Sequence, residues 1–118
     1  MPPQRQKILF VCSQNRIRSL TAEKLLEGHQ RYEARSAGTD PDARIRITAG
    51  HIGWADRIFV MEKRHLERLR KKFRSELKGK EVVCLFIPDE YSPLADDLCE
   101  ILHARLAPYL ELSASGGA

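Results

Sequence analysis

The chain has 118 residues, of which 42% are hydrophobic and 31% are charged, and its formal net charge is +4. This length and composition predict one domain over residues 1–118, with flexible tails at 1–6 and 113–118. No signal peptide is recognisable and no apolar run approaches the ~20 residues of a membrane span. Three cysteines without a CxxC pair argue against a disulfide framework or a zinc site. We therefore expect a cytoplasmic protein with no membrane association, no metal and no cofactor.

Strand and helix patterns alternate along the whole chain. In order, the sequence predicts strand 7–12, helix 19–29, strand 32–38, a short helix within 47–55, strand 56–61, helix 63–74, strand 81–88 and helix 93–110. Strands separated by helices favour right-handed crossovers. The expected fold class is α/β, a three-layer architecture with a four-stranded parallel sheet and helices on both faces.

Several apolar positions are expected in the core. The run Val82–Ile87 is apolar throughout, which is typical of a strand buried on both faces. We expect the following side chains to point inward: Leu25 and Leu26 in the first helix, Leu98, Ile101, Leu102, Leu106 and Tyr109 in the last, Cys84 in the fourth strand, and Trp54 before the third. Cys99 is expected to be inert. The four histidines show no metal-ligand spacing and are expected on the surface or on helices.

The positive charge is concentrated in the segment KRHLERLRKKFR, residues 63–74. Leu66, Leu69, Phe73 and Leu77 recur at near-helical spacing, so the basic side chains occupy the outer face of an amphipathic helix. A solvated face explains this pattern best. Nucleic-acid binding is the alternative, but no recognised module or interleaved aromatic residues accompany the cations.

The stretch ILFVCSQNRIRSLTAEKLL, residues 8–26, places Cys12 at the end of the first strand. A cysteine in such a position often serves as a small core side chain. Ligands of open parallel sheets, however, bind at the carboxyl ends of the strands. Asp89 follows the carboxyl end of the fourth strand, so Cys12 and Asp89 can reach one crevice, although an aspartate after a proline can also merely shape a turn.

Between Cys12 and the helix that begins near Arg18, the backbone N–H groups of residues 13–18 can surround a tetrahedral anion. The same field favours the thiolate of Cys12, and the Arg18 guanidinium matches two phosphate oxygens. This arrangement predicts that Cys12 attacks phosphorus and forms a phosphocysteine. Asp89 would protonate the leaving group and then activate water, with no metal required.

Four motifs carry a resemblance to a known family. VCSQNRIRS, SAGT at 36–39, WADRIFVMEKRHLERL at 54–69 and PDEY at 88–91 occur in order across about residues 7–110. They resemble the low-molecular-weight protein tyrosine phosphatases, in particular a short bacterial branch described as predicted protein tyrosine phosphatases. The resemblance implies hydrolysis of a phosphorylated protein or a small aryl phosphate, with inorganic phosphate as product.

The resemblance also implies roles around the phosphate loop. Asn15 would hold the shape of the loop, the Ser19 hydroxyl would stabilise the Cys12 thiolate, and Tyr91 would wall the pocket beside a substrate ring. The implied substrate-binding residues are Ser13, Gln14, Asn15, Arg16, Ile17, Ser19 and Tyr91.

The chain departs from the family at several of these positions. Gln14 and Arg16 replace small or apolar residues, and Ile17 replaces a second cysteine that could protect the nucleophile as a reversible disulfide. Arg16 either favours highly charged substrates or pairs with a nearby acid. Asp40–Ile47 replaces a longer segment that carries an aromatic pocket wall. Phosphotyrosine, phosphoarginine and small phosphate esters therefore all stay open as substrates.

Two other functions are weighed against a phosphatase. Related arsenate reductases use the same loop but need two further cysteines close together, whereas Cys84 and Cys99 lie in a strand and a helix. A non-catalytic module could hold a phosphorylated partner on the loop or RNA on the basic helix. Such a binder has no use for the combination of Cys12, Arg18 and Asp89. The physiological substrate and the oligomeric state do not follow from the sequence.

Overall fold

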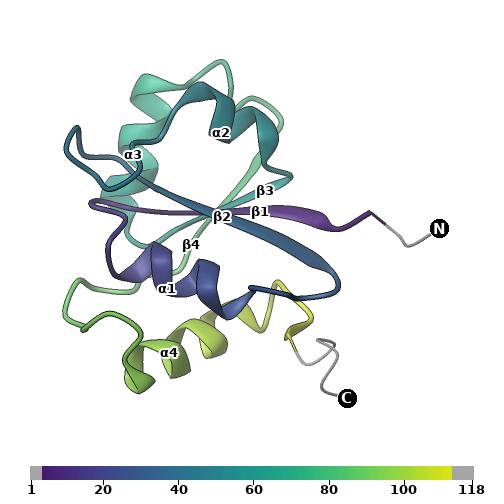
Figure 1. Ribbon diagram of the computed structural model, residues 1–118. Coiled ribbons are helices and arrows are strands. Elements are labelled where there is room, and N and C mark those ends of the chain that lie inside the picture. The colour runs from purple at the N-terminus through teal and green to yellow at the C-terminus, as the bar shows by residue number, and fades with distance from the viewer. Residues whose placement is uncertain (1–3, 113–118) are drawn as a thin grey trace.

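The computed structural model describes residues 4–112, so the parts of the expected tails at 1–3 and 113–118 lie outside the described residues. Within residues 4–112, strands and helices alternate as expected (Figure 1). The elements are β1 (Gln6–Cys12), α1 (Arg18–Leu25), β2 (Tyr32–Gly38), α2 (Ala49–Trp54), β3 (Arg57–Val60), α3 (Lys63–Lys72), β4 (Glu81–Cys84) and α4 (Asp96–Leu106). All neighbouring strands pair in parallel, in the order β2-β1-β3-β4.

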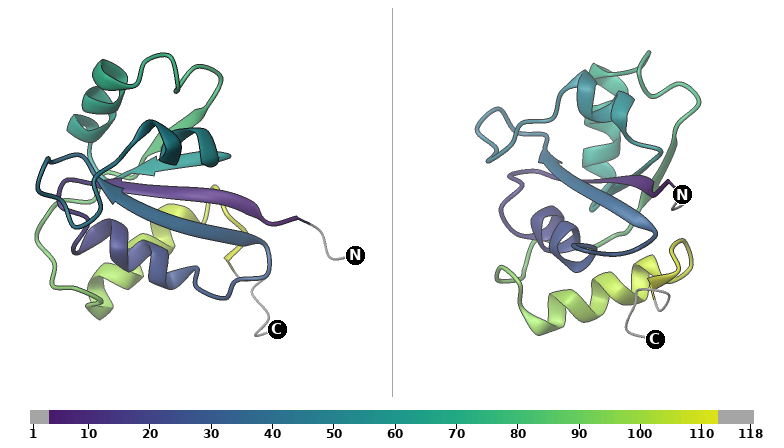
Figure 2. Two further views of the ribbon diagram at one scale, coloured as in Figure 1. Left: turned by 45° about the horizontal axis from the view of Figure 1, so that its top comes forward. Right: turned by 45° about the vertical axis from the view of Figure 1, so that its right-hand side comes forward.

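The central strand β1 separates two apolar clusters because successive side chains of a strand point to opposite faces. Ile8 and Phe10 belong to the cluster beneath α1 and α4, whereas Leu9 and Val11 belong to the cluster beneath α2 and α3. Figure 2 shows the two pairs of helices on either side of the sheet. Full burial of each of these four side chains contributes about 1.5–3 kcal/mol. The three-layer α/β fold with a four-stranded parallel sheet is confirmed.

The expectation for the fourth strand is wrong in part. β4 ends at Cys84 rather than at residue 88, and its side chains are only half-buried or exposed because β4 is an edge strand that pairs with β3 alone. Leu85 and Ile87 beyond it are buried, and their N–H groups bond to the carbonyls of Val60 and Met61. Phe86 between them points outward and is 62% exposed.

The helices are shorter than expected. α1 ends at Leu25, which is exposed, because the chain turns through Gly28 in the left-handed region at φ 76°. α4 buries Leu98, Leu102 and Leu106 along one i, i+4 stripe, which leaves Ile101 half-buried and Tyr109 exposed.

At several single positions the structure can be compared with what the sequence predicts. α3 ends at Lys72. β1 begins at Gln6, which pairs with Tyr32, so the expected flexible tail at 1–6 is wrong for Gln6. The expectation that the histidines lie on the surface or on helices is wrong for His29, which is buried outside any helix, and holds for His65, which is buried but lies in α3. Cys84 and Trp54 pack at the margin of the α2/α3 cluster. Across residues 4–112, no helix has the length and apolarity needed to cross a bilayer.

Candidate active site

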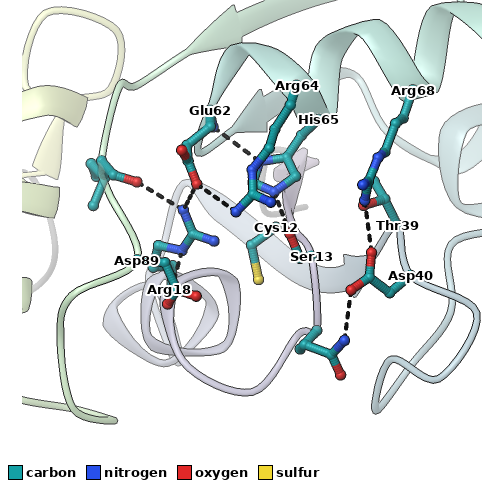
Figure 3. A network of polar contacts seen from close by, with 12 residues as sticks. Cys12, Ser13, Arg18, Thr39, Asp40, Glu62, Arg64, His65, Arg68 and Asp89 are labelled. Atoms are coloured by element: carbon teal, nitrogen blue, oxygen red, sulfur yellow. Dashed lines mark hydrogen bonds and ion pairs between the residues drawn. The ribbon is translucent and has the colours of Figure 1, made fainter.

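Three connections meet at the carboxyl edge of the sheet. The loop 13–17 joins β1 to α1, Glu62 joins β3 to α3, and Asp89 lies in the segment that follows β4. Figure 3 shows Cys12, Arg18, Glu62 and Asp89 gathered at this edge. Parallel strands bring their carboxyl ends together, so residues from distant parts of the chain share one site.

The carbonyl groups of the loop after β1 are held from behind by the segment 39–46. Each of four consecutive carbonyls accepts one hydrogen bond of 2.9 Å: Cys12 O from Thr39 N, Ser13 O from Asp40 N, Gln14 O from Arg44 N, and Asn15 O from Arg44 Nε. Because the carbonyls are tied to this backing segment, they face away from the centre of the loop. The backbone N–H groups are left to face the other side.

The loop leaves its N–H donors free. Within residues 4–112, the N–H groups of Gln14, Arg16, Ile17 and Arg18 donate to no protein acceptor, and that of Asn15 points to Cys12 Sγ at 3.3 Å. Asn15 takes the left-handed conformation, φ 57°, which asparagine tolerates better than most residues. Together with the positive end of α1, these donors form a concave site for a tetrahedral anion.

Gly38 makes the close approach of the backing segment possible. A Cβ atom there would lie 2.5 Å from the Ser13 carbonyl oxygen and 2.6 Å from the Ala43 Cβ. No side chain fits in that space without moving the backbone. The glycine of the SAGT motif is therefore required by the contact between the two segments.

The thiol of Cys12 is buried at the centre of the loop and is 3% exposed. Asn15 Nδ2 donates to Ser19 Oγ at 2.7 Å, so the Ser19 hydroxyl hydrogen is available for Cys12 Sγ, 2.9 Å away. Hydrogen bonds donated to sulfur favour the thiolate over the thiol. The structure thus brings Asn15 and Ser19 into contact with Cys12, as the resemblance implied, and their roles in catalysis stay a prediction.

Arg18 is 2% exposed and is fixed at one end of its guanidinium. Its Nη1 donates to Glu62 Oε1 and, at 2.9 Å, to the carbonyl of Ile87. Its Nε lies 3.8 Å from Asp89 Oδ1. The remaining edge, Nε and Nη2, is the pair of donors that a guanidinium offers to two oxygens of one anion.

Glu62 links the arginine to α3. Burial alone would raise its pKa, but hydrogen bonds from Arg18 and Arg64 outweigh that effect and lower the pKa below its ordinary value. Glu62 is therefore a carboxylate at neutral pH, and it balances the charge of buried Arg18. Sequence reasoning missed this residue, although an acid at the start of a helix after a parallel strand lies at the edge where ligands bind.

His65 was also missed, and it is fully buried beside the loop. Its Nδ1 accepts the backbone N–H of Glu62 at 3.0 Å, so Nε2 carries the hydrogen and donates to Ser13 Oγ at 2.8 Å. Burial, together with the charges of Arg18 and Arg64, lowers its pKa to about 4. A neutral histidine thus fixes the Ser13 side chain and leaves the Ser13 hydroxyl hydrogen free to donate.

The remaining residues of the expected pocket lie less close to the thiol. Gln14 turns toward the backing segment, where Nε2 donates to Asp40 at 2.6 Å and to Asp42 at 3.1 Å. Arg16 is exposed and reaches the carbonyl of Asp42 at 3.5 Å.

Two further residues of that set border the core. Ile17 and Tyr91 are half-buried against the α1/α4 cluster. The structure therefore does not direct the side chains of Gln14 and Arg16 to the thiol, and it packs Tyr91 at the margin of the core. Across residues 4–112, no group of three or more His, Cys, Asp or Glu side chains is arranged to hold a metal ion.

No model of a known protein family matches the chain, and no curated protein matches it either. Solved structures do match. A low-molecular-weight protein tyrosine phosphatase from Streptococcus pyogenes, SP-PTP, superposes with a TM-score of 0.71 at 14% identity, over 90% of this chain and 94% of that one. The tyrosine phosphatase Wzb from Escherichia coli K30, in complex with phosphate, gives 0.68 at 19% identity, over 90% and 96%.

A third match is the YwlE arginine phosphatase from Geobacillus stearothermophilus, with a TM-score of 0.58 at 24% identity, over 91% of this chain and 87% of that one. At such identities the similarity establishes the fold. The fold that the resemblance to the low-molecular-weight protein tyrosine phosphatases implied is therefore confirmed across most of the chain.

Proposed function

We propose that the chain is a phosphomonoester hydrolase, a cysteine-dependent protein tyrosine phosphatase that works through a phosphocysteine. One observation carries the proposal. The carbonyls around Cys12 are tied back while the N–H groups of the same loop are free, and the Arg18 guanidinium lies beside them. That arrangement combines a nucleophile with a preformed site for the charge of a phosphoryl group.

In the first step the Cys12 thiolate attacks phosphorus. A P–S bond forms as the P–O bond to the leaving group breaks, and the loop N–H groups and Arg18 bind the equatorial oxygens. Asp89, protonated, gives its proton to the leaving oxygen. Its side chain is 57% exposed, within reach of a leaving group that projects from the loop, and is tied to the loop through Arg18.

In the second step water attacks the phosphocysteine. The Asp89 carboxylate takes a proton from that water as the new P–O bond forms and the P–S bond breaks. Inorganic phosphate leaves and the Cys12 thiolate is restored. Ser13, whose hydroxyl hydrogen His65 leaves free, adds a donor beside the thiolate.

The positive charge for this reaction comes from the chain itself. The loop N–H groups, the end of α1 and Arg18 supply it, so we propose a reaction that needs no metal and no cofactor. We also propose that the protein works in the cytoplasm, since a thiolate nucleophile requires a reducing compartment. Tyr91, two residues after Asp89, is proposed to border the entrance to the pocket.

Two other functions are less well supported. An arsenate reductase would need Cys84 and Cys99 near Cys12, but Cys84 packs with the α2/α3 cluster while Cys99 lies on α4, which covers the opposite face. A nucleic-acid-binding module would rest on the cations of α3 alone, and two of them, Arg64 and Arg68, already pair with Glu62 and Asp40.

The test is hydrolysis of p-nitrophenyl phosphate by the wild-type protein, Cys12→Ser and Asp89→Ala, in EDTA with a reductant. Turnover should survive EDTA, disappear in Cys12→Ser and fall in Asp89→Ala. Parallel assays with phosphotyrosine and phosphoarginine would identify the substrate, because tyrosine and arginine phosphatases both share the fold. A folded wild-type protein without turnover, or turnover indifferent to Cys12, would refute the proposal.

A further inference from the structure

Phe86 combines two unfavourable properties next to the site. Its backbone has φ 55°, a left-handed conformation that a bulky residue rarely adopts, and its side chain is 62% exposed. The strained backbone and the exposure of an aromatic ring to solvent each lower the stability of the fold. Such strain persists where the surrounding structure imposes it, and it concentrates at functional sites.

The neighbours of Phe86 impose this conformation. Leu85 and Ile87 are buried, and their N–H groups bond to the carbonyls of Val60 and Met61 at 2.9 and 2.8 Å. The carbonyl of Leu85 accepts from Arg105 at 3.1 Å, and that of Ile87 accepts from Arg18 at 2.9 Å. Because both neighbours are held in place, the Phe86 side chain cannot turn into the core. The last of these bonds connects the segment directly to the arginine of the proposed phosphate site.

The ring of Phe86 borders a shallow cavity of about 370 Å³, open to solvent, that Glu62, Lys63, Arg64 and Pro88 also line. Two of its lining residues connect the cavity to the proposed phosphate site. Glu62 accepts a hydrogen bond from Arg18, and Pro88 directly precedes Asp89. A group bound there would lie next to a phosphoryl group bound in the loop.

The charge of this cavity favours an anionic occupant. The carboxylate of Glu62 already forms ion pairs with Arg18 and Arg64. Lys63 has no ion-pair partner among residues 4–112, so its ammonium is available to a ligand. An aromatic ring and a proline beside a free cation suit a polypeptide that presents an acidic side chain and apolar stems.

We propose that the cavity bordered by Phe86, Pro88 and Lys63 is a docking site for the polypeptide that flanks the phosphorylated residue of a protein substrate, with an acidic residue beside that position. The proposal rests on the proposed phosphatase function and selects its substrate class. A phosphorylated protein fills both the loop and the cavity, whereas a small aryl phosphate fills the loop alone.

The experiment compares kcat/KM for p-nitrophenyl phosphate with kcat/KM for a phosphotyrosine peptide flanked by glutamates. The variant is Phe86→Gly, because glycine adopts φ 55° without strain and the ring leaves no core contact behind. We expect Phe86→Gly to lower kcat/KM for the peptide about tenfold more than for p-nitrophenyl phosphate. Its melting temperature should not fall, which separates a docking role from a role in folding.

Leu94 offers a matched control. It is the other exposed large side chain with a left-handed backbone within residues 4–112, at φ 58° and 58% exposure, and it does not line the cavity. Leu94→Gly should leave the ratio of the two kcat/KM values unchanged. Lys63→Gln should lower the preference for a glutamate-flanked over a lysine-flanked peptide about threefold.

The outcomes separate the two proposals. If the wild-type protein does not hydrolyse p-nitrophenyl phosphate, the phosphatase function fails and the docking site falls with it. If it hydrolyses p-nitrophenyl phosphate but Phe86→Gly changes both substrates equally or neither, the docking site alone is refuted. A small ester turned over as efficiently as the acidic peptide would also refute it.

Discussion

The loop after β1 and the segment after β4 lie at the same edge of the sheet but are built in opposite ways. In the first, Cys12 and Arg18 are almost fully buried and four consecutive carbonyls are tied to the backing segment. In the second, Phe86 and Asp89 project into solvent, while Leu85 and Ile87 bond to Val60 and Met61 and Asp89 lies near Arg18. The loop after β1 is the rigid half of the site, which is in place before any ligand arrives. The segment after β4 is the accessible half, which is open to solvent.

This difference matches the tasks that we propose for the two halves. A site for a doubly charged group must have its donors in place in advance, because dipoles that reorient during the reaction stabilise little charge. A proton donor must reach leaving groups of varied shape, which favours an exposed position. Substitutions in the loop should therefore impair folding and activity together, whereas substitution of exposed Asp89 should impair activity alone.

The largest expected effect on activity without an effect on folding comes from Asp89→Asn. Removing a general acid lowers kcat by about 10³-fold, while the free energy of unfolding should change by less than about 0.5 kcal/mol because the side chain is more than half exposed. The loss should be greater for phenyl phosphate than for p-nitrophenyl phosphate, whose leaving group needs a proton less. Steady-state kinetics and urea unfolding measure both quantities.

Glu90→Gln is the matched control for that substitution, because Glu90 is an exposed acid next to Asp89 without an ion pair in the described chain. It should retain wild-type kcat. If Asp89→Asn and Glu90→Gln behave alike, Asp89 is not the general acid.

Gly38→Ala should damage folding and activity together. Its Cβ would lie 2.5 Å from the Ser13 carbonyl oxygen, so the backing segment must withdraw from the loop. A shift of about 1 Å in a catalytic group costs about 10²-fold in rate, and overpacking costs about 1–3 kcal/mol of stability. Gly53→Ala provides the control, since a Cβ at Gly53 meets nothing within 4 Å. A stable and fully active Gly38→Ala would show that the backing segment does not shape the loop.

The rigid half of the site could be predicted from the sequence because its signals are local. Cys12 follows an apolar run, and Arg18 begins a helix six residues later, so the loop and its N–H groups follow from a strand-to-helix connection. The alternation of elements likewise predicted the parallel sheet. Helix ends were less predictable, since Leu25 and Tyr109 continue the apolar pattern after the packed stripe has ended.

The supports of the loop, and the outward turn of the segment after β4, depend on contacts between distant segments. Glu62 meets Arg18 across 44 positions and His65 meets Ser13 across 52, and neither pair leaves a periodic pattern in the sequence. The outward turn of Phe86 contradicts its apolar surroundings, which predicted a continuous buried strand. Sequence patterns report burial well, but they do not report which polar partner a buried group finds.

Glu62→Ala tests how the start of α3 holds Arg18 in the rigid half. Without the carboxylate, Nη1 of Arg18 keeps only the carbonyl of Ile87, and the guanidinium is less well oriented toward the loop. A hydrogen bond to a charged group contributes about 1.5–3 kcal/mol, so we expect kcat/KM for p-nitrophenyl phosphate to fall about tenfold. Glu62→Gln, which keeps an acceptor for Nη1, should lose less. Equal losses in the two variants would assign the effect to charge rather than to orientation.

The smallest effect on activity at neutral pH is expected from His65→Gln. Its consequence is for the pH dependence of stability and appears on acidification. The pKa of buried His65 is lowered from 6.5 to about 4, so the unfolded chain binds more protons than the folded one between these values. The wild-type protein should therefore lose stability as the pH falls from 6.5 toward 4, and His65→Gln should lack this component. Urea unfolding across that range measures the slope, with His103→Gln as an exposed control. Parallel slopes for the wild-type protein and His65→Gln would show that His65 is not held neutral, and would remove the reason for assigning its Nε2 hydrogen to Ser13.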